Sequence, residues 1–227
     1  MSVLNGCKLT YFNLTGRGEA TRLALAIGNI PFEDHRIEFA DWKEWKPKTP
    51  WGSLPSITLK DGTEIAQQRA ILRMVGKEAG LYPLTDIVAA ALVDSVMDAA
   101  EDFFPKTTAI GAGMEKAEKE AARAKECQPG GIVYGMMEKV DGFIAKNGKN
   151  GHAVGDALTI ADLFLYCQFN GLVSGMFDGV PPDASDGFAH ILALRKMVRS
   201  QPAVEAWYDG LKDEYKAKLA ASYGKLE

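Results

Sequence analysis

The first eighty residues change their hydrophobic period several times, which predicts an alternation of short strands and helices. In chain order, the predicted elements are a strand at 7–12, a helix at 19–27, a strand at 32–39, a proline-containing loop at 41–53, a hairpin of strands 54–59 and 64–65 around Asp61-Gly62, and a helix at 68–79 that ends at Gly80. This order predicts a compact α/β unit that contains a hairpin, not a fully parallel sheet.

The hydrophobic pattern becomes helical near residues 83–88, where apolar residues begin to recur at i, i+3 and i+4. Helices are predicted at 87–104, 115–126, 163–172, 187–199 and 202–211. Thr159 and Asp162 precede the third of these helices as an N-capping signature, which we interpret as structural. This change in the hydrophobic pattern predicts an α/β domain at residues 1–83 and an all-helical domain at residues 88–227.

Composition is that of an ordinary globular protein that buries a sizeable core. The chain has 227 residues, of which 47% are hydrophobic and 25% are charged. The formal net charge is −4 and no run of five Lys or Arg occurs, which argues against a nucleic-acid or anionic-membrane surface. We therefore expect a small molecule or another protein as the partner.

The N-terminal segment and the spacing of the cysteines predict a cytoplasmic protein. The segment 1–9 has no long apolar region or cleavage site, and no uninterrupted apolar run of membrane-spanning length follows. The three cysteines, Cys7, Cys127 and Cys167, are widely separated and offer neither a disulfide framework nor a zinc spacing. A reducing compartment suits them.

Several kinds of catalytic site have no support in the sequence. His35, His152 and His190 lie far apart without ligand spacing, so no metal site is predicted. The chain has no GxSxG, Walker or GxGxxG motif, and its first strand-to-helix loop contains no CxxC pair. Metal catalysis and disulfide exchange by the protein's own thiols are therefore not expected.

The first strand-to-helix loop instead offers Tyr11 at the end of a strand and Arg17 at the start of a helix, whose N-terminus favours an anion. A thiolate would suit this position. Ionising a thiol of pKa near 8.5 at neutral pH requires about 2.7 kcal/mol, and one charge-assisted hydrogen bond from a phenol contributes about 1.5–3 kcal/mol. Judged by position alone, however, such a tyrosine is more often a packing or interface residue.

Short motifs spread over nearly the whole chain resemble one family. They are residues 9–23 (LTYFNLTGRGEATRL), Asp41-Trp42, Lys46, residues 51–55 (WGSLP), Asp61-Gly62, Gln67-Gln68, Ala70-Ile71, residues 157–162 (ALTIAD) and Pro202-Ala203-Val204. In order and spacing this set resembles the cytosolic glutathione transferases of the tyrosine type, most closely the sigma class. The resemblance implies a thioredoxin-like N-terminal domain, an all-α C-terminal domain and glutathione as co-substrate, without a cofactor.

The resemblance also implies how glutathione is held. Tyr11 would donate a hydrogen bond to the glutathione sulfur and Arg17 would support the thiolate electrostatically. Trp42 and Lys46 would hold the glycine end of the tripeptide by N–H donation or packing and by pairing a carboxylate. The alternative for these two residues is a packed tryptophan and a solvated loop lysine.

Further contacts with glutathione are implied for the segments that follow. Leu54-Pro55 resembles the family's cis-proline turn, which leaves the backbone N–H and C=O of Leu54 free to pair with the cysteinyl part. Gly52 and Ser53 precede this turn, and Ser53 would contribute only its backbone. Gln67 and Gln68 would receive the γ-glutamyl carboxylate at a helix N-terminus, although the family usually has Ser or Thr where Gln68 stands.

A homodimer is also implied by the resemblance. Asp102 matches an acid that reaches the γ-glutamyl ammonium of the neighbouring subunit. The spacing of Asp94, Asp98 and Asp102 places them on one helical face, and an ordinary solvated stripe is the alternative.

We therefore predict a detoxifying glutathione transferase that conjugates the thiolate to hydrophobic electrophiles. The electrophile pocket is expected near Phe103, Phe104, Met114 and Tyr166. Two alternatives share the framework: a glutathione-dependent isomerase of the prostaglandin D synthase type, and a noncatalytic structural relative.

Overall fold

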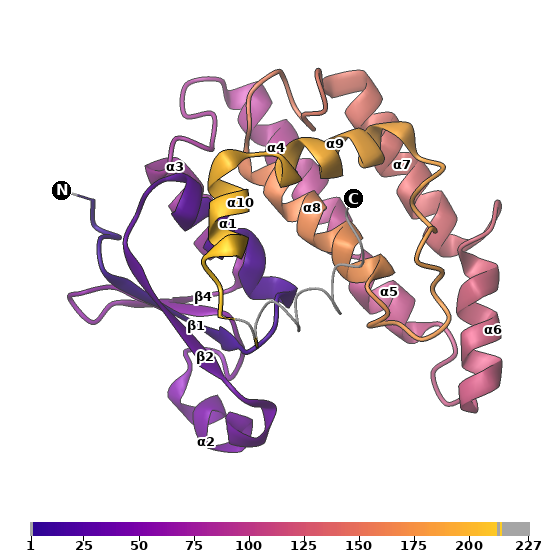
Figure 1. Cartoon of the computed structure of the whole chain (residues 1–227), viewed down its shortest axis with the longest axis horizontal. Helices are drawn as coiled ribbons and strands as arrows, with labels where there is room; N and C mark the ends of the chain where they lie inside the picture. The colour runs from indigo at the N-terminus through magenta and orange to yellow at the C-terminus, as the bar shows by residue number, and fades with distance from the viewer. Residues whose placement is uncertain (1, 213, 215–227) are drawn as a thin grey trace.

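The computed structural model describes residues 2–212 and 214 and has an α/β half followed by a helical half (Figure 1). The final residues of the predicted second domain, 215–227, lie outside the described residues. Among the described helices, none is both long enough and apolar enough to cross a membrane.

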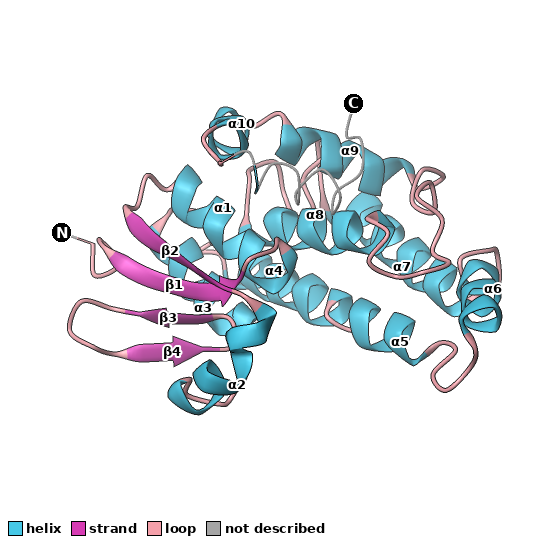
Figure 2. Ribbon diagram, turned by 60° about the horizontal axis from the view of Figure 1, so that its bottom comes forward, coloured by secondary structure: helices cyan, strands magenta, loops and turns pink. Residues whose placement is uncertain are grey.

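Four strands form one mixed sheet in the order β2-β1-β3-β4 (Figure 2). Their bounds are β1 (Cys7–Phe12), β2 (Phe32–Ile37), β3 (Ser56–Thr58) and β4 (Glu64–Ala66). Strand β2 runs parallel to β1, whereas β3 is antiparallel to both β1 and β4. The predicted hairpin is present, and its turn is closed by Asp61, whose carboxylate accepts a 2.9 Å hydrogen bond from the N–H of Thr63. The α/β unit with a hairpin is confirmed.

Two helices, α1 (Glu19–Ile27) and α3 (Gln68–Glu78), pack against each other behind the sheet (Figure 2). The prediction of an irregular loop at 41–53 is partly wrong, because the segment contains α2 (Trp42–Trp45) and a 3₁₀ turn at Lys46–Lys48. Pro47 does not break this turn, since it lies at the helix start, where a backbone N–H has no intrahelical partner. Strand β2 also ends earlier than predicted, because a 3₁₀ turn begins at Phe39.

Apart from helix ends that differ by up to three residues, the helical half differs from its prediction at two places. Its helices are α4 (Ile87–Ala100), α5 (Phe103–Ala109), α6 (Lys116–Glu126), α7 (Ile132–Asn147), α8 (Ile160–Val173), α9 (Ala189–Arg199) and α10 (Pro202–Asp209). The helix predicted over 87–104 breaks after Ala100 and restarts at Phe103. Helix α7 was not predicted from the sequence. Two glycines in its interior, Gly135 and Gly142, each make the helix less favourable by about 1 kcal/mol, so local propensity did not indicate it.

Helix α8 is the centre of the helical half, and every residue in it is buried. Its predicted cap is confirmed: the Asp162 carboxylate accepts from the N–H of Thr159 at 2.7 Å, and the Thr159 hydroxyl accepts from the N–H of Ala161 at 3.3 Å. Asp162 also accepts from the N–H of Ala153 at 2.6 Å, so one buried carboxylate ties the preceding loop to the helix.

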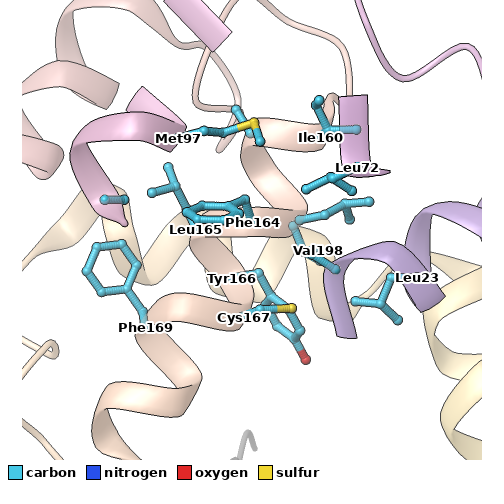
Figure 3. Packing of buried hydrophobic residues seen from close by; sticks show 14 of the residues in the cluster. Leu23, Leu72, Met97, Ile160, Phe164, Leu165, Tyr166, Cys167, Phe169 and Val198 are labelled. Atoms are coloured by element: carbon cyan, nitrogen blue, oxygen red, sulfur yellow. The ribbon is translucent and has the colours of Figure 1, made fainter. Parts of the chain in front are cut away.

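One hydrophobic core runs through both halves of the molecule. Leu72 of α3 lies beside Ile160 in Figure 3, and Leu23 of α1 belongs to the same cluster as the buried residues of α8. A Cβ atom on Gly76 of α3 would overlap the Ile160 side chain, so a glycine is needed where these helices meet. Helix α10 returns to α1, where the indole of Trp207 donates a 3.2 Å hydrogen bond to Glu19 (Figure 1).

Candidate functional site

Tyr11 lies on β1 in the wall of a cavity of about 290 Å³ between the two halves of the molecule. Its side chain is buried, and its phenolic oxygen accepts a 3.0 Å hydrogen bond from the backbone N–H of Arg17. Burial raises the pKa of Tyr11 above its ordinary value, although the Arg17 N–H and the charges of Arg22 and Arg17 oppose the rise. The phenol is therefore neutral at pH 7 and keeps a proton to donate.

The loop that follows β1 approaches the Tyr11 ring closely because it contains two glycines. A Cβ atom on Gly16 would lie 2.7 Å from the phenolic oxygen, and one on Gly18 would lie 2.7 Å from the ring carbon Cδ1. Gly16 also has a φ of +42°, a conformation that other residues seldom adopt. Both positions require glycine if the loop N–H is to reach the hydroxyl.

Arg22 supports this loop from beneath, a role that the sequence did not indicate. Its guanidinium is fully buried and pairs with Glu19 at 3.0 Å and Asp34 at 2.8 Å. It also donates to the carbonyl of Leu14 at 2.7 Å and lies 5.7 Å from the centre of the Tyr11 ring. Burial disfavours the charge, but the two carboxylates overcome that cost and hold the pKa of Arg22 above its usual value.

Arg17, the second predicted catalytic residue, lines the cavity with its side chain half exposed. Its guanidinium forms an ion pair of 2.8 Å with Glu101, which follows the last residue of α4. Sequence patterns offered no sign of this pair, because the two residues are brought together only by the packing of the helical half on the loop.

The remaining cavity wall is mainly apolar. It comes from elements distant in the chain: Phe12, Leu14, Phe39, Phe104 and Met176, together with the polar or thiol side chains of Gln68, Cys167 and Gln168. Phe39 stacks on Phe12 with ring centres 4.4 Å apart, and Gln168 donates a 3.2 Å hydrogen bond to the carbonyl of Ala100. Apart from Phe104 and Gln68, these residues were missed by sequence reasoning, since most lie in loops or within a uniformly apolar helix.

Of the four residues that the sequence places near the electrophile pocket, Phe104 alone lines this cavity. Phe103 and Tyr166 are instead core residues: Phe103 packs edge-on against Phe169, and the Tyr166 ring is buried on α8 beside the core residues in Figure 3. Met114 is exposed in the turn between α5 and α6 and is not part of the cavity wall. The break between α4 and α5 changes which face of the chain points inward, so helical spacing alone could not select the lining residues.

The turn before α3 has an unusual backbone at Gln67, with φ 76° and ψ 110°. A non-glycine residue at positive φ costs about 1–3 kcal/mol and commonly marks a functional site. Gln68, the next residue, lines the cavity with 9% of its surface exposed, and its side-chain Oε1 is buried without a hydrogen-bond partner in the described chain. This pair therefore combines backbone strain with an unsatisfied polar group on a residue of the cavity wall.

The segment predicted to hold the rest of the tripeptide adjoins Phe12. Trp42 contacts the Phe12 ring edge-on, with centres 5.4 Å apart. The side chain of Lys46 runs past Gly52, where an added Cβ would lie 3.5 Å from Lys46 Cε. The Leu54-Pro55 peptide bond is cis, as the sequence predicts, and Ser53 before it is half-buried.

The acidic stripe on α4 is paired within the chain. Asp94 and Asp98 bind Arg73 of α3 at 2.6 Å and 3.0 Å, and Asp98 also binds Arg69 at 2.9 Å. Asp102 lies past the end of α4 and forms an i, i+4 pair of 2.9 Å with Lys106. In the described part of the chain, no three His, Cys, Asp or Glu side chains gather where they could hold a metal ion.

Comparisons with known proteins agree on one family. Residues 101–210 match the family model "Glutathione S-transferase, C-terminal domain". The chain is 35% identical to the hematopoietic prostaglandin D synthase of Gallus gallus and 34% identical to glutathione S-transferase 1 of Ascaris suum, in each case over 88% of this chain and 94% of the relative. The solved structure of prostaglandin synthase D of Nilaparvata lugens is 29% identical and superposes with a TM-score of 0.76 over 90% of this chain and 98% of that one.

Proposed function

This chain belongs to the glutathione S-transferase family, and we propose that Tyr11 holds and activates the thiol of glutathione for attack on electrophilic small molecules. The observation that carries this proposal is a neutral, buried phenol at an apolar cavity, positioned by the Arg17 N–H. The phenol donates to the developing thiolate, and one such bond supplies most of the roughly 2.7 kcal/mol that ionisation at neutral pH requires.

The tripeptide would extend from Tyr11 along the edge formed by α2 and the turn before α3. Trp42 and Lys46 would hold its glycine carboxylate, and the backbone of Leu54 would pair with the cysteinyl part, after Gly52 and Ser53. This assignment is supported by the closeness of Lys46 to Gly52.

Gln67 and Gln68 would receive the γ-glutamyl group. The unpartnered Oε1 of Gln68 supports a contact by the side chain itself, and as an acceptor this atom suits the γ-glutamyl ammonium. The carboxylate of the same group would take N–H donors at the start of α3. Gln68→Leu tests this: the KM for glutathione should rise, while the thermal midpoint stays equal or increases because an unsatisfied buried oxygen is removed.

The electrophile would bind in the apolar part of the cavity, beside Phe39, Phe104 and Met176. With a haloaromatic acceptor, the thiolate sulfur forms the new carbon–sulfur bond and the halide leaves with its electron pair, while the thiol proton passes to solvent. Holding both reactants in one cavity adds proximity to thiolate activation. The walls carry few polar groups, which supports a hydrophobic acceptor.

The decisive experiment compares wild type with Tyr11→Phe. The bound thiolate is titrated by its ultraviolet absorbance, and conjugation of 1-chloro-2,4-dinitrobenzene is measured across pH. We expect the pKa of bound glutathione to rise by about one to two units and the rate at neutral pH to fall accordingly. An unchanged titration and rate in the mutant would refute the role of Tyr11.

A second function, glutathione-dependent isomerisation, is favoured by the similarity to prostaglandin D synthases. It would use the same thiolate and cavity, but the substrate would be rearranged and glutathione released. Parallel assays with a prostaglandin endoperoxide and a haloaromatic acceptor distinguish the two functions. A protein that binds immobilised glutathione but turns over neither substrate would support the structural alternative.

We further propose a cytoplasmic, detoxifying homodimer. The three cysteines are buried and form no disulfide with one another, which suits a reducing compartment. Leu84, Ile87 and Val88 expose large apolar side chains at the start of α4, the kind of surface that subunit contacts cover. Light scattering of wild type and Ile87→Glu tests the dimer, which the added charge should dissociate.

In such a dimer, Asp102 would serve the neighbouring site, as the family resemblance implies. Asp98 is an alternative, because its partner Arg69 directly follows Gln68. Asp102→Asn and Asp98→Asn, measured side by side, identify the acid by the rise in the KM for glutathione.

The proposed domain boundary between residues 83 and 88 is supported by the order of elements. The sheet and its helices end with α3 at Glu78, and α4 begins at Ile87. Limited proteolysis should cut first between these helices if the connecting segment separates two domains.

A further inference from the structure

Glu101 lies where α4 ends, facing the loop that carries Arg17. Its Oε1 pairs with Nη2 of Arg17 at 2.8 Å, and its side chain is one-fifth exposed. Its other oxygen, Oε2, is buried and has no hydrogen-bond partner among the described residues. An ion pair whose arginine is half exposed stabilises a protein little, and a buried carboxylate oxygen without a partner costs free energy. Stability alone therefore gives a poor account of this arrangement.

Arg17 connects Glu101 to Tyr11. Its backbone N–H binds the phenolic oxygen at 3.0 Å, its side chain lines the cavity, and its guanidinium reaches Glu101. Among the ion pairs of the described residues, this is the one that includes a residue of the cavity wall.

We propose that Glu101 is a positioning residue that holds the Arg17 guanidinium at the cavity wall and offsets its positive charge beside the glutathione thiolate. This inference rests on the proposed function, since it requires glutathione at Tyr11. The charge of Glu101 also acts on the phenol, where it raises the pKa of Tyr11.

Such an offset has a chemical advantage. A cation beside a thiolate increases the ionised fraction, but the nucleophilicity of a thiolate falls as its pKa falls. The best attacking thiol has a pKa near the ambient pH. By neutralising part of the Arg17 charge, Glu101 would keep the thiolate reactive while Tyr11 keeps it ionised.

The other charged or ionisable groups near the Arg17–Glu101 pair either have partners of their own or lie on other elements. Arg22 lies beneath the Tyr11 ring and is neutralised by Glu19 and Asp34. Cys167 lines the cavity from α8, and Asp102 pairs with Lys106. Because Cys167 could contribute its own thiolate signal, each titration is read as the difference between protein with and without glutathione.

The test is a cycle of Glu101→Gln, Arg17→Ala and the double variant, with the pKa of bound glutathione and the pH profile of kcat/KM as readouts. Glu101→Gln keeps an oxygen for Arg17 but removes the charge, so the pKa of the bound thiol should fall by about 0.5, which is about threefold more thiolate below that pKa. Arg17→Ala leaves Glu101 unpaired and should raise the pKa of the bound thiol. Adding Glu101→Gln to Arg17→Ala should then bring the pKa back toward wild type.

Glu120→Gln, which removes a charge from an exposed pair on α6, is the matched control and should change neither readout. If Glu101 has only a structural role, the Glu101→Gln substitution should change the melting temperature without lowering the pKa of the bound thiol. That result, or a failure to reverse the effect of Arg17→Ala, would overturn the proposal while leaving the proposed function intact. If wild type ionises no glutathione at all, the proposed function fails as well.

Discussion

Phe39 stacks on Phe12 with ring centres 4.4 Å apart and an interplanar angle of 21°, and 64% of its surface remains exposed. The outer ring thus presents an aromatic surface to solvent at a cavity whose wall both residues form. A flat acceptor that enters the cavity would cover this surface and gain the stacking and burial that the free protein lacks.

Phe39→Ala should therefore weaken acceptor binding. Loss of one aromatic contact, about 0.5–1.5 kcal/mol, predicts a two- to twelvefold higher KM for 1-chloro-2,4-dinitrobenzene. The KM for glutathione should not change, because Phe39 is not among the residues proposed to hold the tripeptide. Steady-state kinetics with each substrate varied in turn checks both statements, and Phe39→Tyr, which keeps the ring, should behave like wild type. Equal KM values for Phe39→Ala and wild type would exclude the ring from the acceptor site.

Met176 and Met114 form a natural matched pair, since both are about half exposed but only Met176 lines the cavity. Met176→Ala removes part of the apolar wall and should raise the KM for a hydrophobic acceptor about two- to fivefold. Met114→Ala should leave that value unchanged. If the two variants behave alike in an acceptor series of increasing size, the cavity beside Tyr11 is not where the acceptor binds.

Arg22→Met should destabilise the protein strongly. It leaves the buried Glu19 without its cation and deprives the loop carbonyl of Leu14 of a donor. Removing one partner of a buried pair typically costs about 3–5 kcal/mol, which denaturant unfolding would measure. Arg73→Met, which breaks more exposed pairs with Asp94 and Asp98, should cost about 1 kcal/mol or less. A comparable loss in the two variants would contradict the importance of the buried network.

His152 should make stability depend on pH. Its Nδ1 lies 3.8 Å from the Asp162 carboxylate, an ion-pair contact too long for a hydrogen bond, and this carboxylate raises the pKa of His152. A raised pKa in the folded state stabilises the protein below the unfolded value, near 6.5, and this contribution is lost as pH rises through the folded value.

Replacing His152 with glutamine should therefore lower the free energy of unfolding at about pH 5.5 by less than about 1 kcal/mol. The same substitution should have little effect at about pH 8.5. Urea unfolding at both pH values checks this. The control is His190→Gln on the exposed start of α9, where only the backbone N–H contacts Asp141. A difference that grows with rising pH would mean that the sign is wrong.

Much of the fold followed from local patterns, because backbone conformation responds to neighbours in the chain. The strand at 7–12, the Asp61-Gly62 turn and the cap formed by Thr159 and Asp162 all appeared where the sequence predicts them. The predicted fold class is confirmed by the family match and the superposed structure. Helix α7 and the break after Ala100 did not follow, since packing there outweighs local propensity.

For the candidate site, the sequence by itself determined the chemical groups: a tyrosine ending a strand, an arginine opening a helix, and glycines that let the loop approach the ring. Only the tertiary structure decided what surrounds them. Phe39, Met176 and Glu101 come from a 3₁₀ turn, a loop and a helix end far apart in the chain, and Arg22 of α1 lies beside the ring of Tyr11 on β1. Periodicity describes one element at a time, whereas a cavity and its charge balance arise from how separate elements pack together.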